Sequence, residues 1–251
     1  MDESLREKFR YFLKDTARQT IDFRLTDQSR GLPPPPLEKP FPADGKRIDL
    51  VPVEGLRDMS ARDVFSAISS RRSRRAFSAA PLTLIELSFL LWATQGIRKL
   101  AGPSAAFRTV PSAGCRHALE TYLCVLNVEG LAQGIFRYLP VEHQLLLVSQ
   151  PAGLSHKITE STLGQEFVGN AAVTFLWTAI PYRMEWRYDI AAHKVIAIDA
   201  GHVCQNLYIA CEAIGAGTCA VAAYHQELMD SLLGVDGTEE FTLYLAAVGK
   251  V

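Results

Sequence analysis

The sequence predicts an α+β protein, because its helical and strand-like segments follow one another in blocks. Helical patterns come first. Three strand-like segments follow with only turns between them, and strands then alternate with helices up to the C-terminus. A doubly wound sheet would need a helix after nearly every strand, so the uninterrupted strands favour α+β. With 48% hydrophobic and 21% charged residues, the chain can bury a sizeable core.

Two helices are expected in the first half of the chain from their capping residues. Ser60 and Asp63 are N-cap residue types that stand before apolar residues at helical spacing. Thr83 and Glu86 form a capping box, and Gly96 marks the end of the helix that follows. The apolar residues that carry the two helices are Val64, Phe65, Ile68, Leu84, Leu87, Leu90 and Leu91.

The rest of the chain alternates between apolar runs and turn residues. A loop rich in arginine, lysine, glycine and proline is expected from Gly96 to Val110. Strands are expected over residues 119–128, 135–139, 144–149, 172–180, 218–224 and 241–248. The second and third of these complete a β-meander, and 172–180 has the length of one buried strand. Helices are expected over residues 199–214 and 225–233.

The helix over residues 199–214 is a candidate dimer contact. One of its faces carries the apolar residues Val203, Leu207, Cys211 and Ile214, and Gly215 ends it. The small residues Ala200, Gly201 and Ala210 would let another helix approach closely, so we expect this helix to pair with a second subunit. His202 is either a catalytic residue or a hydrogen-bonded histidine at the helix start.

Residues 1–50 differ from the rest and are expected to form an N-terminal extension to a domain of residues 51–251. Phe9, Phe12 and Leu13 can line a short helix, and Pro33–Pro36 form a polyproline spacer that fits neither a helix nor a central strand. We expect the extension to wrap the surface or a partner subunit. A ligand segment for a proline-binding module is the alternative.

Composition excludes several functions. The net charge is −1, which argues against nucleic acid, and no apolar run approaches the length that crosses a bilayer. The charged N-terminus has no signal-peptide core, so a cytoplasmic location is the default. The five cysteines contain no CxxC pair and the six histidines are scattered, so we expect neither a disulfide framework nor a metal site.

An arginine cluster is the most informative segment. It comprises Arg71, Arg72, Ser73, Arg74 and Arg75. Guanidinium is a rigid fork of donors that matches phosphate oxygens. In a chain of nearly neutral charge, the cluster indicates either a grip on one phosphate or a solvated turn after a helix.

Three further segments are candidate parts of a site. The first is a small, kinked loop in which backbone amides could approach a planar ligand, and it consists of Pro111, Ser112, Ala113 and Gly114. The second is a run of small residues that starts at Gly215 and ends with Ala220, Val221, Ala222 and Ala223. The third is Lys250, which could reach a phosphate. A loop, a glycine helix cap and a solvated chain end are the ordinary explanations of the three. Together with the arginine cluster, and with no GxxxxGK[ST] loop, they fit a flat phosphorylated cofactor such as FMN.

Several motifs resemble the nitroreductase superfamily, and within it the SagB-type dehydrogenases. The resemblance covers roughly residues 60–251. It rests on RRSxRxF at 71–77, PLT at 81–83, LWATQG at 91–96, PSAG at 111–114 and LETY at 119–122, then on Arg183, Arg187, Tyr188 and the DAGHxxQN pattern from Asp199.

The resemblance implies an α+β sandwich with a mixed, largely antiparallel central sheet flanked by helices, and an intertwined homodimer with two FMN sites. It implies phosphate contacts from Arg71, Arg72, Ser73, Arg75 and Lys250. It places the loop from Pro111 to Gly114, supplied by the other subunit, and the backbone of Ala220–Ala223 near the flavin ring. Backbone amides there would stabilise charge on the reduced ring.

The sequence departs from the family pattern at two places. Arg187 stands where the dehydrogenases have the lysine of a catalytic Lys-Tyr pair, and arginine cannot act as a general base at neutral pH. Proton acceptance is therefore expected to fall to Tyr188, with His193, His202 or water as the alternatives, and Arg187 would favour the Tyr188 phenolate or hold an anionic substrate group. The Leu-Tyr-Pro that usually follows the PSAG-like loop is replaced by Cys115-Arg116-His117-Ala118, so the substrate pocket is expected to differ.

Three functions remain open at this point. The first is an FMN-dependent dehydrogenase that takes hydride through flavin N5 from a small molecule or a heterocycle in a modified peptide. The second is a reductase of nitroaromatics or quinones that uses NAD(P)H as electron donor. The third is a degenerate member without flavin that acts as a scaffold.

Overall fold

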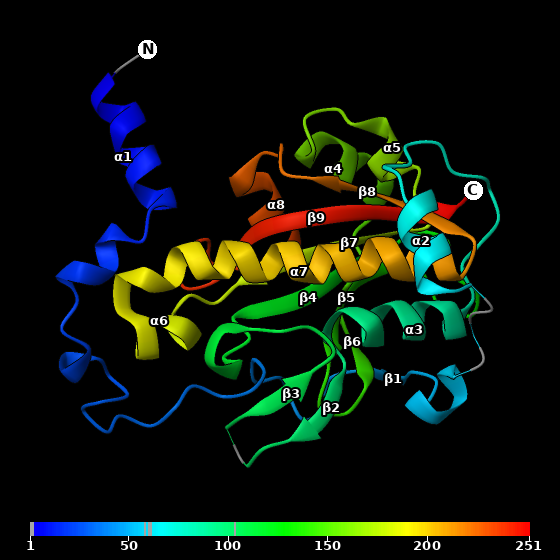
Figure 1. The fold of residues 1–251 in the computed structure, drawn as a ribbon. Helices are drawn as coiled ribbons and strands as arrows, with labels where there is room; N and C mark the ends of the chain where they lie inside the picture. The colour runs from blue at the N-terminus through cyan, green and yellow to red at the C-terminus, as the bar shows by residue number, and fades with distance from the viewer. Residues whose placement is uncertain (1–2, 58, 60–61, 103) are drawn as a thin grey trace.

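The computed structural model describes residues 3–57, 59, 62–102 and 104–251, and it is built around a seven-stranded sheet (Figure 1). The strand order is β1-β6-β5-β4-β7-β9-β8, and each of these neighbouring pairs is antiparallel. The strands are β1 (Arg47–Asp49), β4 (Leu119–Val125), β5 (Gly134–Leu139), β6 (Gln144–Ser149), β7 (Val173–Ala179), β8 (Ala216–Val221) and β9 (Phe241–Lys250). A separate hairpin joins β2 (Ile97–Leu100) to β3 (Ala106–Arg108).

Helices cover both faces of the sheet. The described helices are α1 (Glu3–Leu13), α2 (Val64–Ser70), α3 (Leu84–Gln95), α4 (Leu154–Ser161), α5 (Glu166–Gly169), α6 (Tyr182–Tyr188), α7 (Ala192–Ala213) and α8 (Gln226–Leu233). In Figure 1, α3 and α7 lie in front of the sheet and α4, α5 and α8 lie behind it. The largely antiparallel sheet between helices confirms the predicted α+β sandwich.

Side-chain alternation along the central strands builds two cores. On β4, Leu123 packs into the core beneath α3 and α7, whereas the adjacent Cys124 packs into the core beneath α4, α5 and α8. On β7, Trp177 and Leu176 divide in the same way. All four side chains are fully buried, as expected of strands covered on both faces.

The two expected capped helices are present. Thr83 Oγ1 accepts from the amide of Glu86, and the Glu86 carboxylate accepts from the amide of Thr83, so α3 has its capping box. Gly96 is the C-cap of α3. Asp63 caps α2 by accepting from the amide of Ser66 at 2.9 Å, whereas Ser60 lies outside the described residues.

The long helix α7 differs from its prediction in two ways. It begins at Ala192, seven residues before the expected start, because α6 and a short 3-10 turn (Asp189–Ala191) lead directly into it without an N-cap side chain. The expected apolar face exists, but Val203 and Leu207 are buried in the chain's own core. The prediction that this face forms the dimer contact is therefore wrong. Ala200 and Ala210 are buried in that core as well, while Gly201 is exposed.

Other elements were not expected from the sequence. The expected loop before residue 110 contains the β2–β3 hairpin, and α4, α5 and α6 have no counterpart in the predicted elements. β8 starts at Ala216, two residues before the expected start at 218, and ends at Val221 instead of 224. These elements are short, and tertiary contacts hold them in place.

The N-terminal extension wraps the domain and completes its sheet. Pro33–Pro36 lie in neither a helix nor a strand, and the following residues are fixed by buried arginines. Arg108 donates to the carbonyl of Leu37 at 2.9 Å, and Arg137 donates to the carbonyl of Lys39 at 2.8 Å. Further along, β1 pairs with β6 at the edge of the sheet. The extension thus contributes a strand to the fold.

A buried ion pair links the central strand β4 to α6. Arg183 Nη2 lies 2.5 Å from Glu120 Oε1, and each side chain is only 3% exposed. Burial raises the pKa of Glu120, but the charges of Arg183 and Arg137 outweigh it and leave the pKa below its ordinary value. The pair gives a structural role to Glu120 of the LETY segment and to Arg183. It fixes α6, and with it Arg187 and Tyr188, against the sheet.

No helix within the described residues is long and apolar enough to cross a membrane. All five cysteines are free thiols.

Candidate functional site

The arginine segment, residues 71–78, docks along the edge strand β8. Ser73 forms a parallel β-bridge with Thr218, and the amide of Arg74 donates to the Thr218 carbonyl at 2.9 Å. The amide of Ser78 donates to the carbonyl of Lys250 at 2.8 Å. The segment is therefore a fixed part of the sheet edge and not a solvated turn.

Two glycines make this docking possible. A Cβ added at Gly217 would lie 2.6 Å from Cγ of Arg74, and a Cβ added at Gly249 would lie 2.8 Å from Cγ of Phe77. Any side chain at either position would push the arginine segment off the sheet. Glycine at 217 in β8 and at 249 in β9 thus leaves room for the arginine segment to pack against the sheet.

Tyr208 of α7 joins the arginine segment to β8. Its hydroxyl lies 2.9 Å from Ser73 Oγ and accepts from the amide of Ala220 at 3.0 Å. The guanidinium of Arg71 lies over its ring, 5.3 Å from the centroid. The sequence analysis missed Tyr208, because 135 positions separate it from Ser73. The amide of Ala220 is occupied by this hydroxyl, whereas Ala222 and Ala223 are exposed.

The arginine segment keeps most of its positive charge uncompensated. Within the described part of the chain, Arg71, Arg72 and Arg75 form no ion pair with a carboxylate. Arg75 instead lies 5.8 Å from the ring centroid of Phe167. Burial raises the pKa of the neighbouring Cys219, an effect that Arg75 and Ser73 partly offset. The segment is a fixed concentration of positive charge that fits a phosphate.

Lys250 is engaged inside the fold. Its ammonium group pairs with the Glu86 carboxylate and donates to the carbonyl of Ile214 at 2.9 Å. It therefore ties the end of β9 to the start of α3 and the end of α7. To contact a phosphate, this lysine would have to leave Glu86.

A second group of predicted residues gathers at the other end of the molecule. The loop after Pro111 contains a short 3-10 turn (Ala113–Cys115), in which Gly114 has φ +57°. A Cβ at Gly114 would lie 2.5 Å from the hydroxyl of Tyr188 and 3.1 Å from Nε of Arg187. The glycine therefore lets the loop contact the two expected catalytic residues, and the fold brings all three together.

Ser112 and Asp199 hold this loop from behind. Ser112 Oγ accepts from the amide of His117 at 2.9 Å. Burial raises the pKa of Asp199, while the Ser112 hydroxyl, His202 and the Ala113 amide partly offset that rise. His202 is 47% exposed and its Nδ1 is 4.0 Å from Asp199 Oδ1. His202 therefore lies beside Asp199 in the interior of α7, and not at the start of the helix as one of the two predictions had it.

His117 is a buried, neutral side chain. Burial lowers its pKa to about 3, and the charge of Arg108 acts in the same direction. Its Nε2 lies 3.1 Å from the Ala106 carbonyl and donates to it. A histidine held neutral in this way orders the loop and does not exchange protons near neutral pH.

The two groups of residues lie apart within one chain. Tyr208 follows Asp199 by nine positions on α7, which corresponds to about 14 Å along the helix and about half a turn around it. The arginine segment and the loop at Gly114 thus approach α7 from different sides. Within one chain they therefore form two separate groups.

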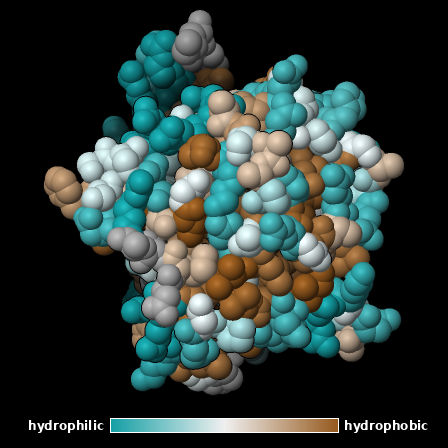
Figure 2. Space-filling view, turned by 90° about the vertical axis from the view of Figure 1, so that its right-hand side faces the viewer, coloured by the Kyte–Doolittle hydropathy of each residue, from teal (hydrophilic) through white to brown (hydrophobic). Residues whose placement is uncertain are grey.

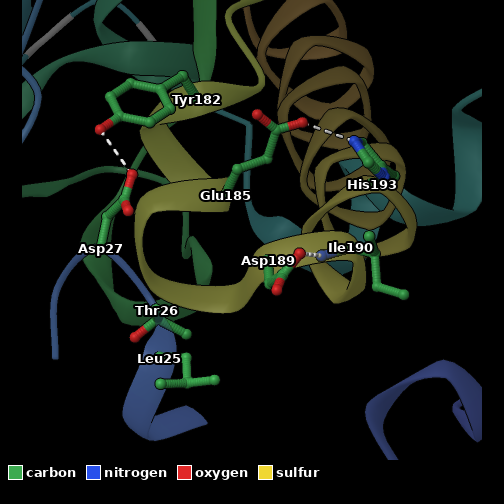
Figure 3. Close-up of a pocket in the computed structure, with 8 residues that line it drawn as sticks. All are labelled: Leu25, Thr26, Asp27, Tyr182, Glu185, Asp189, Ile190 and His193. Atoms are coloured by element: carbon green, nitrogen blue, oxygen red, sulfur yellow. Dashed lines mark hydrogen bonds and ion pairs between the residues drawn. The ribbon is translucent and has the colours of Figure 1, made fainter. Parts of the chain in front are cut away.

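The pocket in Figure 3 lies between the N-terminal extension and α6. It has a volume of about 280 Å³ and is lined by Leu25, Thr26, Asp27, Tyr182, Glu185, Asp189, Ile190 and His193. The Tyr182 hydroxyl donates to Asp27 at 2.9 Å, and Glu185 pairs with His193 at 2.7 Å. Neither Arg187 nor Tyr188 lines this pocket. Among the described residues, no group of three or more histidine, cysteine or carboxylate side chains could hold a metal ion.

Comparison with known proteins identifies the class. The model of the nitroreductase family matches residues 68–250. A protein of Methanocaldococcus jannaschii named as a nitroreductase is 30% identical over 195 residues, which is 78% of this chain and 94% of that protein. The chain belongs to the nitroreductase family and is an oxidoreductase.

Solved structures agree on the fold. A nitroreductase-type protein of Ralstonia eutropha matches with a TM-score of 0.68 and 24% identity, over 88% of this chain and 99% of that one. A chain of the Escherichia coli microcin synthetase McbBCD complex, with truncated pro-MccB17 bound, matches with a TM-score of 0.61 and 20% identity, over 81% of this chain and 84% of that one.

Proposed function

We propose that this chain is an FMN-dependent oxidoreductase in which Arg71, Arg72, Ser73 and Arg75 hold the FMN phosphate. The observation that carries the proposal is the docked arginine segment, whose backbone is bonded to the sheet edge and whose Arg71, Arg72 and Arg75 form no ion pair with a carboxylate among the described residues. A phosphate would neutralise several of them through charge-assisted hydrogen bonds. FMN, when bound, supplies a flavin N5 that accepts or gives hydride.

The backbone beyond β8 is the proposed neighbour of the flavin ring. Tyr208 occupies the amide of Ala220, so the exposed Ala222 and Ala223 are left to face the ring, with Val221 buried behind them. We propose that Lys250 supports the phosphate site through its backbone. Its carbonyl accepts a hydrogen bond from the amide of Ser78 and so helps to hold the arginine segment in place.

The native protein is proposed to be a homodimer, in which the loop from Pro111 to Gly114 of one subunit completes the site of the other. The arginine segment and the loop at Gly114 approach α7 from different sides in one chain, and this arrangement supports the proposal. So does the outer face of α7, where Ile198 is 47% exposed and Gly201 has open space around it.

Exposed apolar residues on α2 extend that face. Val64 is 68% exposed, Phe65 81% and Ile68 58%. Figure 2 views the molecule from the side that carries α2, and hydrophobic surface gathers there. Large apolar patches on a surface mark contacts with other proteins. We expect sedimentation to show a dimer for the native protein and a monomer for Phe65→Glu. A native monomer loaded with FMN would contradict the proposal.

Dehydrogenation of a peptide heterocycle is the proposed reaction, with Tyr188 as the acid/base residue and Arg187 beside it. The similarity in fold to a microcin synthetase chain, solved with truncated pro-MccB17 bound, supports a peptide substrate. The guanidinium of Arg187 lies over the Tyr188 ring, 5.5 Å from its centroid, so the two side chains are in contact. The alternative is an NAD(P)H-driven reductase of nitroaromatics or quinones, which the name of the archaeal relative favours.

Two measurements test this function. The purified protein should be yellow and release FMN, and not FAD, on denaturation. A protein that stays colourless after incubation with FMN would support the flavin-free scaffold instead. Flavin reduction by azoline peptides should be slower in Tyr188→Phe than in the native protein. If azolines reduce neither form while NAD(P)H reduces both, the reductase is the correct reading.

A further inference from the structure

Arg116 and Arg187 stand together beside Tyr188. We propose that these two guanidinium groups bind a carboxylate of the substrate, so that the substrate is an organic acid. This inference rests on the proposed function and names the class of substrate for that site.

Arg116 is held in place by three contacts. Its Nη2 donates to the Ser104 carbonyl at 2.9 Å, and its Nε donates to the Gly114 carbonyl at 3.3 Å. Its guanidinium lies 5.3 Å from the ring centroid of Trp186. The side chain is partly buried, so its position is set before a ligand arrives.

Arg187 reaches the same place from α6. A Cβ at Gly114 would lie 3.1 Å from both Cδ and Nε of Arg187. Its guanidinium lies over the Tyr188 ring. Burial lowers the pKa of Arg116, and the like charge of Arg187 lowers it further, which places the two cations within electrostatic reach of each other.

Nearby carboxylates do not compensate these charges. Glu185 pairs with His193, and Asp189 accepts from the amide of Ile190 at 2.6 Å. Both carboxylates line the pocket of Figure 3, which neither Arg116 nor Arg187 lines. Asp199 lies behind the loop, where it interacts with the Ser112 hydroxyl and the Ala113 amide. Within the described residues, neither Arg116 nor Arg187 forms an ion pair with a carboxylate.

Two adjacent guanidinium groups without a counter-ion repel each other, and a bound anion relieves that repulsion. Each presents a planar fork that matches the two oxygens of a carboxylate. A carboxylate held there would place the rest of the substrate beside the Tyr188 hydroxyl, which contacts Gly114. The pair would therefore select acids and orient them toward the acid/base residue.

The test compares 4-nitrobenzoate with 4-nitrobenzamide, which have similar shapes but differ in charge. Calorimetric titration of the FMN-loaded protein should show that the acid binds at least about tenfold more tightly than the amide. The preference should weaken as salt is added. Arg116→Gln and Arg187→Gln should each weaken binding of the acid more than binding of the amide, and so remove most of the preference. Arg10→Gln on α1 is the matched control and should behave as the native protein.

Two results would overturn the proposal. The first is equal binding of acid and amide by the native protein. The second is a preference that survives in the Arg116→Gln/Arg187→Gln protein. If that double variant also shifts the flavin reduction potential, the two charges serve the reduced flavin instead. Flavin content is measured on the same samples, so loss of FMN binding, which defeats the proposed function, is seen separately from loss of acid preference. In a flavin-free protein, Trp186 fluorescence reports acid binding, because Arg116 lies against its ring.

Discussion

Replacing Tyr208 by phenylalanine removes one hydroxyl and keeps the ring on which Arg71 lies. That hydroxyl lies 2.9 Å from Ser73 Oγ and 3.0 Å from the amide nitrogen of Ala220. Each such hydrogen bond contributes a net stabilisation of about 0.5–1.5 kcal/mol. Water can replace part of it, because Tyr208 and Ala220 are only partly buried. We therefore expect Tyr208→Phe to lower the free energy of unfolding by about 1–2 kcal/mol.

The same substitution should weaken FMN binding, because Ser73 loses the partner that fixes its hydroxyl. We expect the Kd for FMN to rise about three- to tenfold, which corresponds to about 0.7–1.4 kcal/mol. Urea unfolding of the apoprotein gives the stability, and quenching of flavin fluorescence on titration gives the Kd.

Tyr138→Phe is a matched control for this experiment. The Tyr138 hydroxyl lies 2.8 Å from His143 Nδ1, on β5 and away from the arginine segment. Its removal should lower stability and leave the Kd for FMN unchanged. The reasoning is refuted if Tyr208→Phe binds FMN within about twofold of the native protein.

Three further predictions concern the packing and charge of the fold. Gly217→Ala puts a Cβ 2.6 Å from Cγ of Arg74. Urea unfolding should therefore show that the free energy of unfolding falls by about 1–3 kcal/mol, and titration should show weaker FMN binding. An unchanged protein would contradict the docking of the arginine segment. Burial, and then the charge of a neighbouring carboxylate, raises the pKa of Glu38 from 4.5 to about 7. The folded protein therefore favours the protonated Glu38 carboxyl, whose contribution to stability is complete below pH 4.5 and is lost as the pH rises through 7. Glu38→Gln should therefore be more stable than the native protein at pH 8 but not at pH 4, and equal urea midpoints at pH 8 would disprove this. Glu120→Gln leaves Arg183 without its buried partner and should lower the free energy of unfolding by about 3–5 kcal/mol, whereas a loss below about 1 kcal/mol would show that the pair is dispensable.

Local signals in the sequence predicted the elements that depend on neighbouring residues. The capping box of α3 needs only Thr83 and Glu86, three positions apart, and the structure contains it. The start of α7 was misplaced because no capping side chain marks it, since α6 and a 3-10 turn run into it directly. The exposure of an apolar face also cannot be read from its periodicity. The face of Val203 and Leu207 looked like a dimer contact but covers the chain's own sheet.

The candidate site was predictable in its residue types but not in its assembly. The arginine cluster and the PSAG-like loop stood out by composition, whereas Tyr208 contacts Ser73 across 135 positions and gave no local signal. Gly217 stood within the predicted run of small residues, but the reason for glycine at 217 and at 249 is the close packing of Arg74 and Phe77, which only the folded sheet reveals. Likewise, Arg116 first appeared only as a departure from a family pattern, and its position beside Arg187 gave it a role.

The central claim is that the arginine segment holds the phosphate of FMN. Riboflavin carries the same ring and ribityl chain without the phosphate, so titration of the apoprotein with both flavins measures the phosphate contribution directly. We expect riboflavin to bind at least about a hundredfold more weakly than FMN, in line with one or two charge-assisted hydrogen bonds. In Arg71→Ala/Arg75→Ala the ratio should fall below about tenfold. Equal affinity of the native protein for the two flavins would contradict the claim.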